Sequence, residues 1–445
     1  MTRLNRLADF AASMVLSDPA ERETVRWAGI DLMGCVLAGS RHQTARQVRA
    51  GCAGSPGPAP VFGTGQRVAV PLAALCNATA SHVQDFDDWE EPGNTHPSAV
   101  LWPAIWALAA LRPIDGEHAA TAYAAGFEII ARLGEALNLN HYNLGFHATA
   151  TIGTIGAAGA AARALNLDGA QTAHALSLAI SQAQGFTCQI GTGAKPLQTG
   201  FAARDGLTAA LLAEQGVTAS PAAFDGPKGF VTLLCHREPD RLDRMLQRLN
   251  GRALSEWGLA FKLYPSCSYT HRLVDCARAL APRIDPAAIS RVEAELPDFH
   301  HAIARCDRPS TPTEAMFSVP FGAATALLRG TVTLDDFAPE QIAAAPLRTL
   351  IGKVEIRAMP PARPELNFDP DQPDRLRVTL SSGEVLEETC AYPEGAPQHP
   401  AGTALLREKF MTNGAHMAPA ALDAFLSWDQ PGDLGVRLAS LAHAP

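Results

Sequence analysis

Charge and aromatic side chains are scarce in this chain of 445 residues, at 18% and 6%. Acidic residues outnumber basic ones, 45 against 36, and the formal net charge is -9. Without a basic excess the sequence lacks the electrostatic footprint of a nucleic-acid-binding protein, so we expect no nucleic-acid partner. It also lacks an apolar run that could span a bilayer, and its N-terminus is amphipathic with no cleavage signal. We therefore expect a cytoplasmic protein with no membrane partner.

Cysteine pairs and the common cofactor motifs are missing as well. The nine cysteines are scattered, odd in number and without a CxxC spacing, which indicates neither a disulfide framework nor a zinc site. The motifs GxGxxG, GxxxxGK[ST], HExxH, GxSxG and SxxK do not occur in a supporting context. Dinucleotide-binding, nucleotide-binding, zinc-protease and serine-hydrolase functions therefore have no support.

Small residues and helical periodicity dominate the chain up to about residue 262. Apolar residues recur there at helical spacing, interrupted by Gly and Pro, and small residues favour close packing of helix on helix. The segments that connect the predicted helices are short, which is typical of neighbouring antiparallel helices. The pattern predicts helices over residues 23–39, 70–86, 98–112, 116–137, 150–165, 169–185, 201–216 and 239–249.

A second pattern follows the YPSC stretch, where residues alternate between apolar and polar. Period-two segments at 289–297, 353–360 and 374–393 predict strands, and SSGE inside the last predicts a hairpin. Residues 321–330 predict a helix between these strands. The residues that follow, up to the C-terminus, again have helical periodicity. We predict a mainly α fold, with a large all-helical domain of residues 1–265 and 396–445 and a smaller α+β domain of residues 266–395.

The densest polar cluster is HVQDFDDWEEPGNTHPSAV, residues 82–99. We expect its carboxylates at the C-terminal end of a helix, where the macrodipole disfavours negative charge. Asp85 and Asp88, three residues apart, would share a helix face, with Asp87 turned away. The functional interpretation is that Asp85 orients a catalytic or substrate-binding group, and the alternative is a solvated acidic loop.

Two histidines stand at predicted helix starts. Pro97 suits the first helical position, which leaves His96 at or next to the N-cap, and His147 opens GFHATATIG in the same way. The helix after His147 carries Gly153, Gly156 and Gly159, which permit a neighbouring helix to approach closely.

An imidazole at the positive end of a helix is biased toward its neutral form and can act as a base. The free N–H groups of both helix starts can receive a carboxylate. Two such histidines can therefore converge on one acid substrate; alternatively, each only caps or packs.

Cationic and thiol groups complete the set of candidates. Lys195 precedes Pro196, which predicts an extended residue, and it can neutralise a substrate carboxylate or simply point to water. The predicted domain junction FKLYPSCSYTH holds Lys262, Cys267 and His271, and junctions favour ligand sites. Cys267 is a possible nucleophile, but a buried thiol without a local base is the alternative that we favour.

Taken together, several segments resemble the MmgE/PrpD superfamily, whose members include 2-methylcitrate dehydratase, cis-aconitate decarboxylase and iminodisuccinate epimerase. The resemblance covers most of the chain and rests on five segments in this order: IDLMGCVLAGS, ATASHVQDFDDWEEPGNTHPSAVLWPAIWALAA, HYNLGFHATATIGTIGAAGAAARALNLD, AKPLQTGFAARDGLTAALLAEQGVTAS and FKLYPSCSYTHRLVDCA.

The resemblance implies a helical large domain, a smaller α+β domain, a site between them, a homodimer, and catalysis without an organic cofactor or an obligatory metal. It also implies functional roles for the residues that match the family motifs, namely Asp85, His96, His147, Lys195 and Lys262. Tyr142 resembles the tyrosine of epimerase-like members. Where a decarboxylase-like member has a threonine and a second histidine, this chain has Trp89 and Cys267, and one extra residue lies between Asp85 and His96.

We therefore predict proton transfer next to a carboxylate of a small di- or tricarboxylic acid, with dehydration or a related lyase reaction favoured. His147 is the predicted base, and Tyr142 or His96 the opposing acid. Lys195 and Lys262 would hold substrate carboxylates, and Asp85 would orient an imidazole. An epimerase with two-base proton transfer is the first alternative. A magnesium-dependent terpene-type enzyme that uses DFDD is the second, and a non-catalytic helical scaffold is the third.

Overall fold

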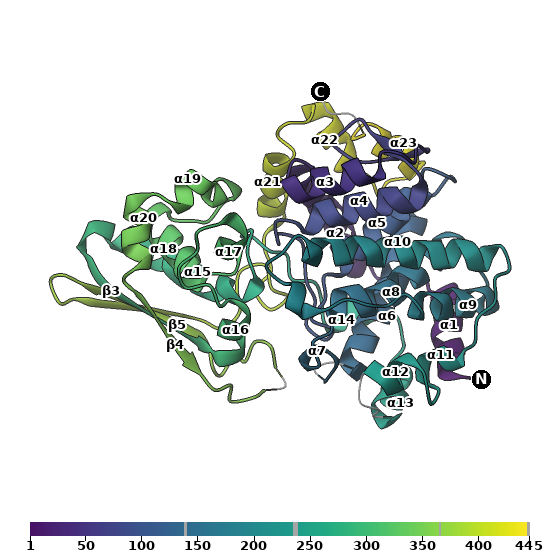
Figure 1. The fold of residues 1–445 in the computed structure, drawn as a ribbon, viewed down its shortest axis with the longest axis horizontal. Coiled ribbons are helices and arrows are strands. Elements are labelled where there is room, and N and C mark those ends of the chain that lie inside the picture. Colours follow the sequence, from purple (N-terminus) through teal and green to yellow (C-terminus); the bar gives the residue numbers. More distant parts are fainter. Residues whose placement is uncertain (138–139, 235–238, 365, 443–445) are drawn as a thin grey trace. The chain divides into compact units, whose positions relative to one another are not determined.

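The computed structural model describes residues 1–137, 140–234, 239–364 and 366–442 (Figure 1). The chain forms two compact units. Unit 1 comprises Met1–Val83, Asp87–Phe261 and Gly402–Pro445, and unit 2 comprises Gln84–Phe86 and Lys262–Ala401. The domain boundaries expected from the sequence, after residues 265 and 395, differ from these by a few residues and did not include the short excursion at 84–86.

Within its described residues, unit 1 is helical apart from one two-stranded ribbon, β1 (Ala59–Pro60) with β2 (Arg67–Val68). A 3-10 helix, η1 (Thr187–Gln189), precedes α10. Its α-helices are α1 (Arg3–Ser13), α2 (Pro19–Gly39), α3 (Gln43–Cys52), α4 (Val70–His82), α5 (Pro97–Leu108), α6 (Gly116–Leu137), α7 (Asn140–Asn143), α8 (Ala148–Ala164), α9 (Gly169–Ile180), α10 (Ala194–Glu214), α11 (Ala222–Asp225), α12 (Phe230–Leu234), α13 (Pro239–Gln247), α14 (Ala253–Glu256), α21 (Thr403–Asn413), α22 (Pro419–Phe425) and α23 (Leu434–Ala439).

Helix α8 lies at the centre of unit 1 and packs against α5, α6, α9 and α10 (Figure 1). Its glycines make this possible. A Cβ atom on Gly153 would lie 3.2 Å from Val100 of α5, and Cβ atoms on Gly156 and Gly159 would lie 2.3 Å from isoleucine side chains of α6. The prediction that this glycine stripe admits neighbouring helices at close range is confirmed.

Helices α21 to α23 return to the N-terminal helices of unit 1 after the excursion into unit 2. The ammonium of Lys409 on α21 lies 2.7 Å from a carboxylate oxygen of Asp31 on α2, and both side chains are buried. Trp428 is fully buried against Trp102 of α5, with 4.8 Å between ring centroids. The C-terminal segment is thus part of the core of unit 1.

Unit 2 is built on a four-stranded sheet in the order β4-β3-β5-β6, in which β3 is parallel to β4 and antiparallel to β5. The strands are β3 (Ile289–Pro297), β4 (Val354–Met359), β5 (Asp374–Leu380) and β6 (Val385–Cys390). The α-helices are α15 (His271–Leu280), α16 (Asp298–Ile303), α17 (Pro312–Met316), α18 (Val319–Arg329), α19 (Pro339–Ile342) and α20 (Ala345–Ile351), and the 3-10 helices are η2 (Ser268–Thr270), η3 (Ala281–Arg283), η4 (Pro286–Ala288) and η5 (Leu334–Phe337).

The predicted strands and hairpin are confirmed. Strands β5 and β6 pair in antiparallel fashion from Asp374↔Cys390 to Thr379↔Val385, and the turn between them has Gly383 at a φ of 87°. Helices α15 and α18 pack on the sheet, and α18 also contacts α20 (Figure 1). The predicted combination of a large helical part with a smaller α+β part is therefore confirmed. Within the described residues, the helices are all too short or too polar to cross a membrane.

Candidate active site

Three long helices of unit 1 begin at residues that the sequence singled out. His96 is the N-cap of α5 and His147 is the N-cap of α8, as predicted, and neither imidazole forms a capping hydrogen bond. Lys195 is the second residue of α10. The expectation of an extended Lys195 is therefore wrong, because a proline is tolerated in the first turn, where a helix has no internal partner for its N–H group.

The starts of α5 and α8 are joined directly. The backbone N–H of His96 donates a hydrogen bond to the hydroxyl of Thr149, in the first turn of α8, at 3.1 Å. The Lys195 ammonium is near enough to lower the pKa of His147. His147 and Lys195 are both buried. The N-termini of three helices, each the positive end of its macrodipole, thus lie in the same region of unit 1.

A glutamine sets the tautomer of His147. Nδ1 of His147 lies 2.8 Å from Oε1 of Gln198, and the amide nitrogen of Gln198 donates to the carbonyl of Phe186 at 3.2 Å. Because that second bond directs the amide oxygen toward the imidazole, Nδ1 must carry the proton. Nε2 of neutral His147 therefore has a lone pair. Gln198 lies one turn after Lys195 on α10, on the same helix face.

The protonation state of His147 suits a base. Burial lowers its pKa well below 6.5, and the charges of Lys195 and His82 lower it further. Burial disfavours the charged form, and a neighbouring cation acts in the same direction. His147 is therefore a neutral imidazole at neutral pH. The sequence predicted a neutral His147 from its position at a helix start. The structure gives the same neutral state, but burial and the charge of Lys195 are its causes.

The carboxylate of Asp87 contacts two imidazoles of unit 1. Both carboxylate oxygens of Asp87 lie 2.9 Å from Nδ1 of His82, and one lies 3.2 Å from Nδ1 of His96. The ring of His82 lies 4.5 Å from that of His96 and 6.4 Å from that of His147, between centroids. His82, the last residue of α4, was not among the predicted site residues, although its position beside DFDD was a usable signal.

The prediction that the acidic residues sit at the end of a helix is wrong. Helix α4 ends at His82, and Asp85 has a φ of 49°, a left-handed conformation that a helix does not contain. Asp85 and Asp88 accordingly share no helix face, and Asp87 is not turned away from the site. The alternative of a solvated loop is also wrong for the main carboxylates, because Asp85, Asp87, Asp88 and Glu90 are all buried.

Asp88 and Glu90 have local structural contacts. The carboxylate of Asp88 accepts hydrogen bonds from the backbone N–H and the hydroxyl of Ser98, in the first turn of α5, and burial raises the pKa of Asp88. Burial likewise raises the pKa of Glu90 to about 7, although Gly93 and Thr95 donate hydrogen bonds to it. Through these hydrogen bonds, the two carboxylates fix the conformation of the loop that places His96 at the start of α5.

Unit 2 contains Asp85, Lys262, Cys267 and His271. The ammonium of Lys262 donates to the backbone carbonyl of Asp85 at 2.9 Å and lies 3.2 Å from the Asp85 carboxylate, and both side chains are buried. Cys267 is a buried free cysteine, as favoured from the sequence, and its N–H donates to the carbonyl of Met316. The imidazole of His271, the first residue of α15, bonds the carbonyl of Ser266 at 3.1 Å.

Tyr142 lies on the short helix α7 and is half-buried. Its neighbour His141 is fully buried, and its two ring nitrogens bond the carbonyl of Leu234 and the hydroxyl of Thr151. His141 thus has a structural role in the loop that precedes α8. The acid role of Tyr142 stays a prediction, as do the roles of Asp85, Lys262, Cys267 and His271 toward a substrate.

The imidazoles and the shared carboxylate also have the composition of a metal site. His82, Asp87 and His96 offer ligand atoms that lie within 4.8 Å of one another. Two imidazoles and a carboxylate suit several divalent cations. Asp87 is hydrogen-bonded to His82 without an ion, and catalysis without a metal or organic cofactor stays a prediction that metal analysis tests.

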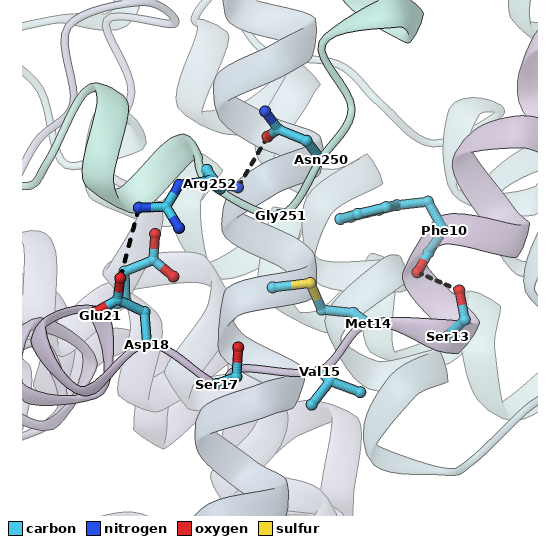
Figure 2. Close-up of a pocket in the computed structure, with 10 residues that line it drawn as sticks. All are labelled: Phe10, Ser13, Met14, Val15, Ser17, Asp18, Glu21, Asn250, Gly251 and Arg252. Atoms are coloured by element: carbon cyan, nitrogen blue, oxygen red, sulfur yellow. Dashed lines mark hydrogen bonds and ion pairs between the residues drawn. The ribbon is translucent and has the colours of Figure 1, made fainter.

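A separate surface pocket lies away from these residues, between the end of α1 and residues 250–252 (Figure 2). It has a volume of about 250 Å³ and is lined partly by Met14, Asp18, Glu21 and Arg252. Asp18 is the N-cap of α2, and the buried Glu21 bonds Ser255. Its polar groups thus serve the local structure, and it contains none of the predicted site residues.

Comparison with known families assigns the chain. The sequence model of the MmgE/PrpD N-terminal domain matches residues 5–242, and that of the MmgE/PrpD C-terminal domain matches residues 264–429. The chain therefore belongs to the MmgE/PrpD family, as its motifs indicated.

Curated relatives agree with this assignment. The chain is 30% identical over 378 residues to cis-aconitate decarboxylase of Homo sapiens, which covers 82% of this chain and 75% of the relative. The enzyme of the same name from Mus musculus is 29% identical over 367 residues, with 79% and 73% covered. One from Aspergillus terreus is 26% identical over 423 residues, with 88% and 84% covered.

Proposed function

We propose that this protein is a lyase that moves a proton at a carbon next to a carboxylate of a small di- or tricarboxylic acid. The observation that carries the proposal is the buried, neutral His147, whose Nδ1 is bonded to Gln198 and whose Nε2 is left as a base. The family assignment and the relatives, which are named as decarboxylases, support a lyase.

The surrounding charges suit an anionic substrate. A carbon acid next to a carboxylate is very weak, and removing its proton requires positive groups that stabilise the developing charge. Lys195 lies at the N-terminus of α10, and the N-termini of α5 and α8 add the positive ends of their macrodipoles. In our proposal these groups receive a substrate carboxylate.

Two lyase outcomes share this machinery. In dehydration, His147 takes the proton from carbon, and the β-hydroxyl leaves as water with a proton supplied by His96. In decarboxylation, the bond between carbon and CO₂ breaks, and the carbon keeps the electron pair until it takes a proton from an imidazole. The relatives favour decarboxylation, whereas Trp89 and Cys267 depart from the decarboxylase-like pattern, so both outcomes belong to the proposal.

The other hypotheses gain no support. The relatives are named as decarboxylases, which does not favour an epimerase. A terpene-type enzyme would use the DFDD carboxylates for magnesium or proton donation, but Asp85 pairs with Lys262 and Asp87 with His82. A non-catalytic scaffold does not account for a cluster of three imidazoles, two of which are buried.

The first test is proton NMR in D₂O with a panel of small polycarboxylates that includes cis-aconitate and its hydrated tricarboxylic acids. We expect one substrate to lose CO₂ or water, with deuterium incorporated at the product carbon when the proton comes from solvent. In the matched variant His147→Asn, the amide nitrogen replaces the N–H donor to Gln198 but provides no base. We expect its turnover to fall by about a hundred-fold to ten-thousand-fold. Full activity in this variant would contradict the assignment of the base.

A further inference from the structure

The segment that follows α9 pairs with the start of α8. The backbone N–H of His147 donates a hydrogen bond to the carbonyl of Gly185 at 3.0 Å. Phe146 and Phe186 form an isolated antiparallel bridge beside it, and their ring centroids are 5.9 Å apart. The backbone of His147 is therefore held as in a short β-ribbon, and residues 185–186 fix its orientation.

The side chain of His147 is tied to the same segment through Gln198 of α10. Oε1 of Gln198 lies 2.8 Å from Nδ1 of His147, and the amide nitrogen donates to the carbonyl of Phe186 at 3.2 Å. Both His147 and Gln198 are buried. Two consecutive carbonyls, those of Gly185 and Phe186, thus fix the backbone of His147 directly and its imidazole through one amide.

These hydrogen bonds are all satisfied in only one direction. If Nε2 of His147 carried the proton instead, Nδ1 would need a donor, and the amide of Gln198 would have to turn its nitrogen toward the imidazole. The amide oxygen would then face the carbonyl of Phe186, and two acceptors without a donor between them are unfavourable. The Phe186 carbonyl therefore selects the orientation of the amide, and the amide selects the tautomer.

Gly185 is the point at which the segment approaches this amide most closely. A Cβ atom on Gly185 would lie 2.9 Å from Oε1 of Gln198 and 2.5 Å from the Cβ atom of Ala150 in α8. Both distances are shorter than van der Waals contact, so a side chain at 185 would displace the amide oxygen or push the segment away from α8. Glycine at this position thus permits the contact between Gln198 and His147.

We propose that Gln198 and Gly185 are positioning residues for the base: they hold His147 with its proton on Nδ1, so that the lone pair of Nε2 is available before a substrate binds. The partner of Nδ1 is an uncharged amide and not the aspartate of a catalytic triad. It therefore orients the imidazole without placing a negative charge beside an anionic substrate. The inference rests on the proposed function in taking His147 as the base and an acid as the substrate.

Two variants of Gln198 separate its hydrogen bonds from its shape. Gln198→Met keeps the length of the side chain but neither hydrogen bond. We expect its kcat to fall by about a hundred-fold with a smaller change in KM, because a misplaced base affects the chemical step. Gln198→Glu keeps an acceptor for the Nδ1 proton, so it should retain more of kcat than Gln198→Met, while its negative charge raises KM. Equal losses of kcat in the two variants, or a parental kcat in Gln198→Met, would overturn the proposal.

Gln184→Met is the control for these variants, because Gln184 lies in the same segment but is exposed to solvent. Its kcat and KM should match those of the parent. A loss as large as that of Gln198→Met would show that any change near this segment impairs the enzyme, and the specific role of Gln198 would be wrong.

Gly185→Ala tests the close approach. We expect kcat to fall by at least about tenfold and Tm to fall as well, because the new Cβ atom meets both Ala150 and Gln198. The double variant Gly185→Ala/Ala150→Gly removes the clash between the two Cβ atoms but keeps the one with the amide. Its Tm should recover in part while its kcat stays low. If kcat recovers together with Tm, Gly185 serves only packing and its positioning role is overturned.

Nitrogen-15 NMR of the imidazoles tests the proposal without any substrate, with the signals of His147 assigned by their loss in His147→Asn. We expect the Nδ1–H tautomer of His147 in the parent protein and a shift toward the Nε2–H tautomer in Gln198→Met. An Nε2–H tautomer in the parent, or the same tautomer in both proteins, would overturn the proposal even for an active lyase. If the tautomers are as expected but no panel acid reacts, only the proposed function fails.

Discussion

At the residue scale, the pKa of His147 leads to a prediction about pH. Burial and the Lys195 ammonium place this pKa well below 6.5, so the base stays unprotonated as the pH falls through 6.5. We expect the low-pH limb of kcat/KM to lie below pH 6.5. Lys195→Met removes the cation but keeps the burial, so the limb should move to higher pH while KM rises. Profiles of kcat/KM between pH 5 and 8 measure both effects.

Lys228→Met is the matched control, because Lys228 belongs to unit 1 but is exposed to solvent. Its low-pH limb should coincide with that of the parent. A parental limb at pH 6.5 or above, or a limb that stays in place in Lys195→Met, would show that His147 is not the titrating base or that Lys195 does not act on it.

Several residues of the candidate site cannot be recognised from their own sequence neighbourhood. Gln198 is 51 residues from His147 in sequence, and nothing in its neighbourhood indicates that its amide faces an imidazole. Its spacing of three from Lys195 was the one usable signal, because the helix that contains both places them on one face. The choice between Asp85 and Asp87 depended on backbone conformation. A left-handed Asp85 cannot be read from DFDD, and the contact of Asp87 with the imidazoles of unit 1 was not predicted.

At the scale of the elements, the contact between α6 and α8 depends on glycine. A Cβ atom on Gly156 would lie 2.3 Å from Ile130, and it would also approach the backbone carbonyl of Gly126 at 3.1 Å. Because a backbone atom cannot yield as a flexible side chain does, we expect Gly156→Ala to lower the free energy of unfolding by about 1–3 kcal/mol. Chemical denaturation followed by circular dichroism measures this change.

Gly51→Ala is the control at this scale. Gly51 lies in α3, and a Cβ atom there would meet nothing within 4 Å. The substitution should stabilise the protein by about 0.5–1 kcal/mol, because alanine loses less backbone freedom in a helix than glycine does. Equal effects of the two substitutions on stability would show that Gly156 is not required for the close packing of α8 against α6.

At the scale of the whole molecule, the C-terminal helices complete the core of unit 1. Lys409→Ala on α21 would leave the buried carboxylate of Asp31 without its cation, and burial already raises the pKa of Asp31. Removing one partner of a buried ion pair is expected to cost about 3–5 kcal/mol. Arg407→Ala on the same helix breaks an exposed pair with Asp423 and should cost at most about 1 kcal/mol. Urea denaturation of both variants compares them, and equal losses would contradict a core role for α21.

The predicted homodimer and the cytoplasmic location are also properties of the whole molecule, and both stay predictions. Sedimentation velocity of the purified protein tests the first, and fractionation of the source cells tests the second.

Local pattern was enough for most helices and strands of this protein and for the starts of α5 and α8. The correctly predicted features each act over a few residues, so the local amino-acid sequence determines them. They are the hydrophobic periodicity, Pro97 after His96, the glycines of α8 and the SSGE turn. The partners of the imidazoles are different, because Gln198 reaches His147 and Thr149 reaches His96 only after helices that are distant in the chain have packed. Packing also buries these groups, and burial rather than the helix dipole is the main cause that keeps His147 neutral.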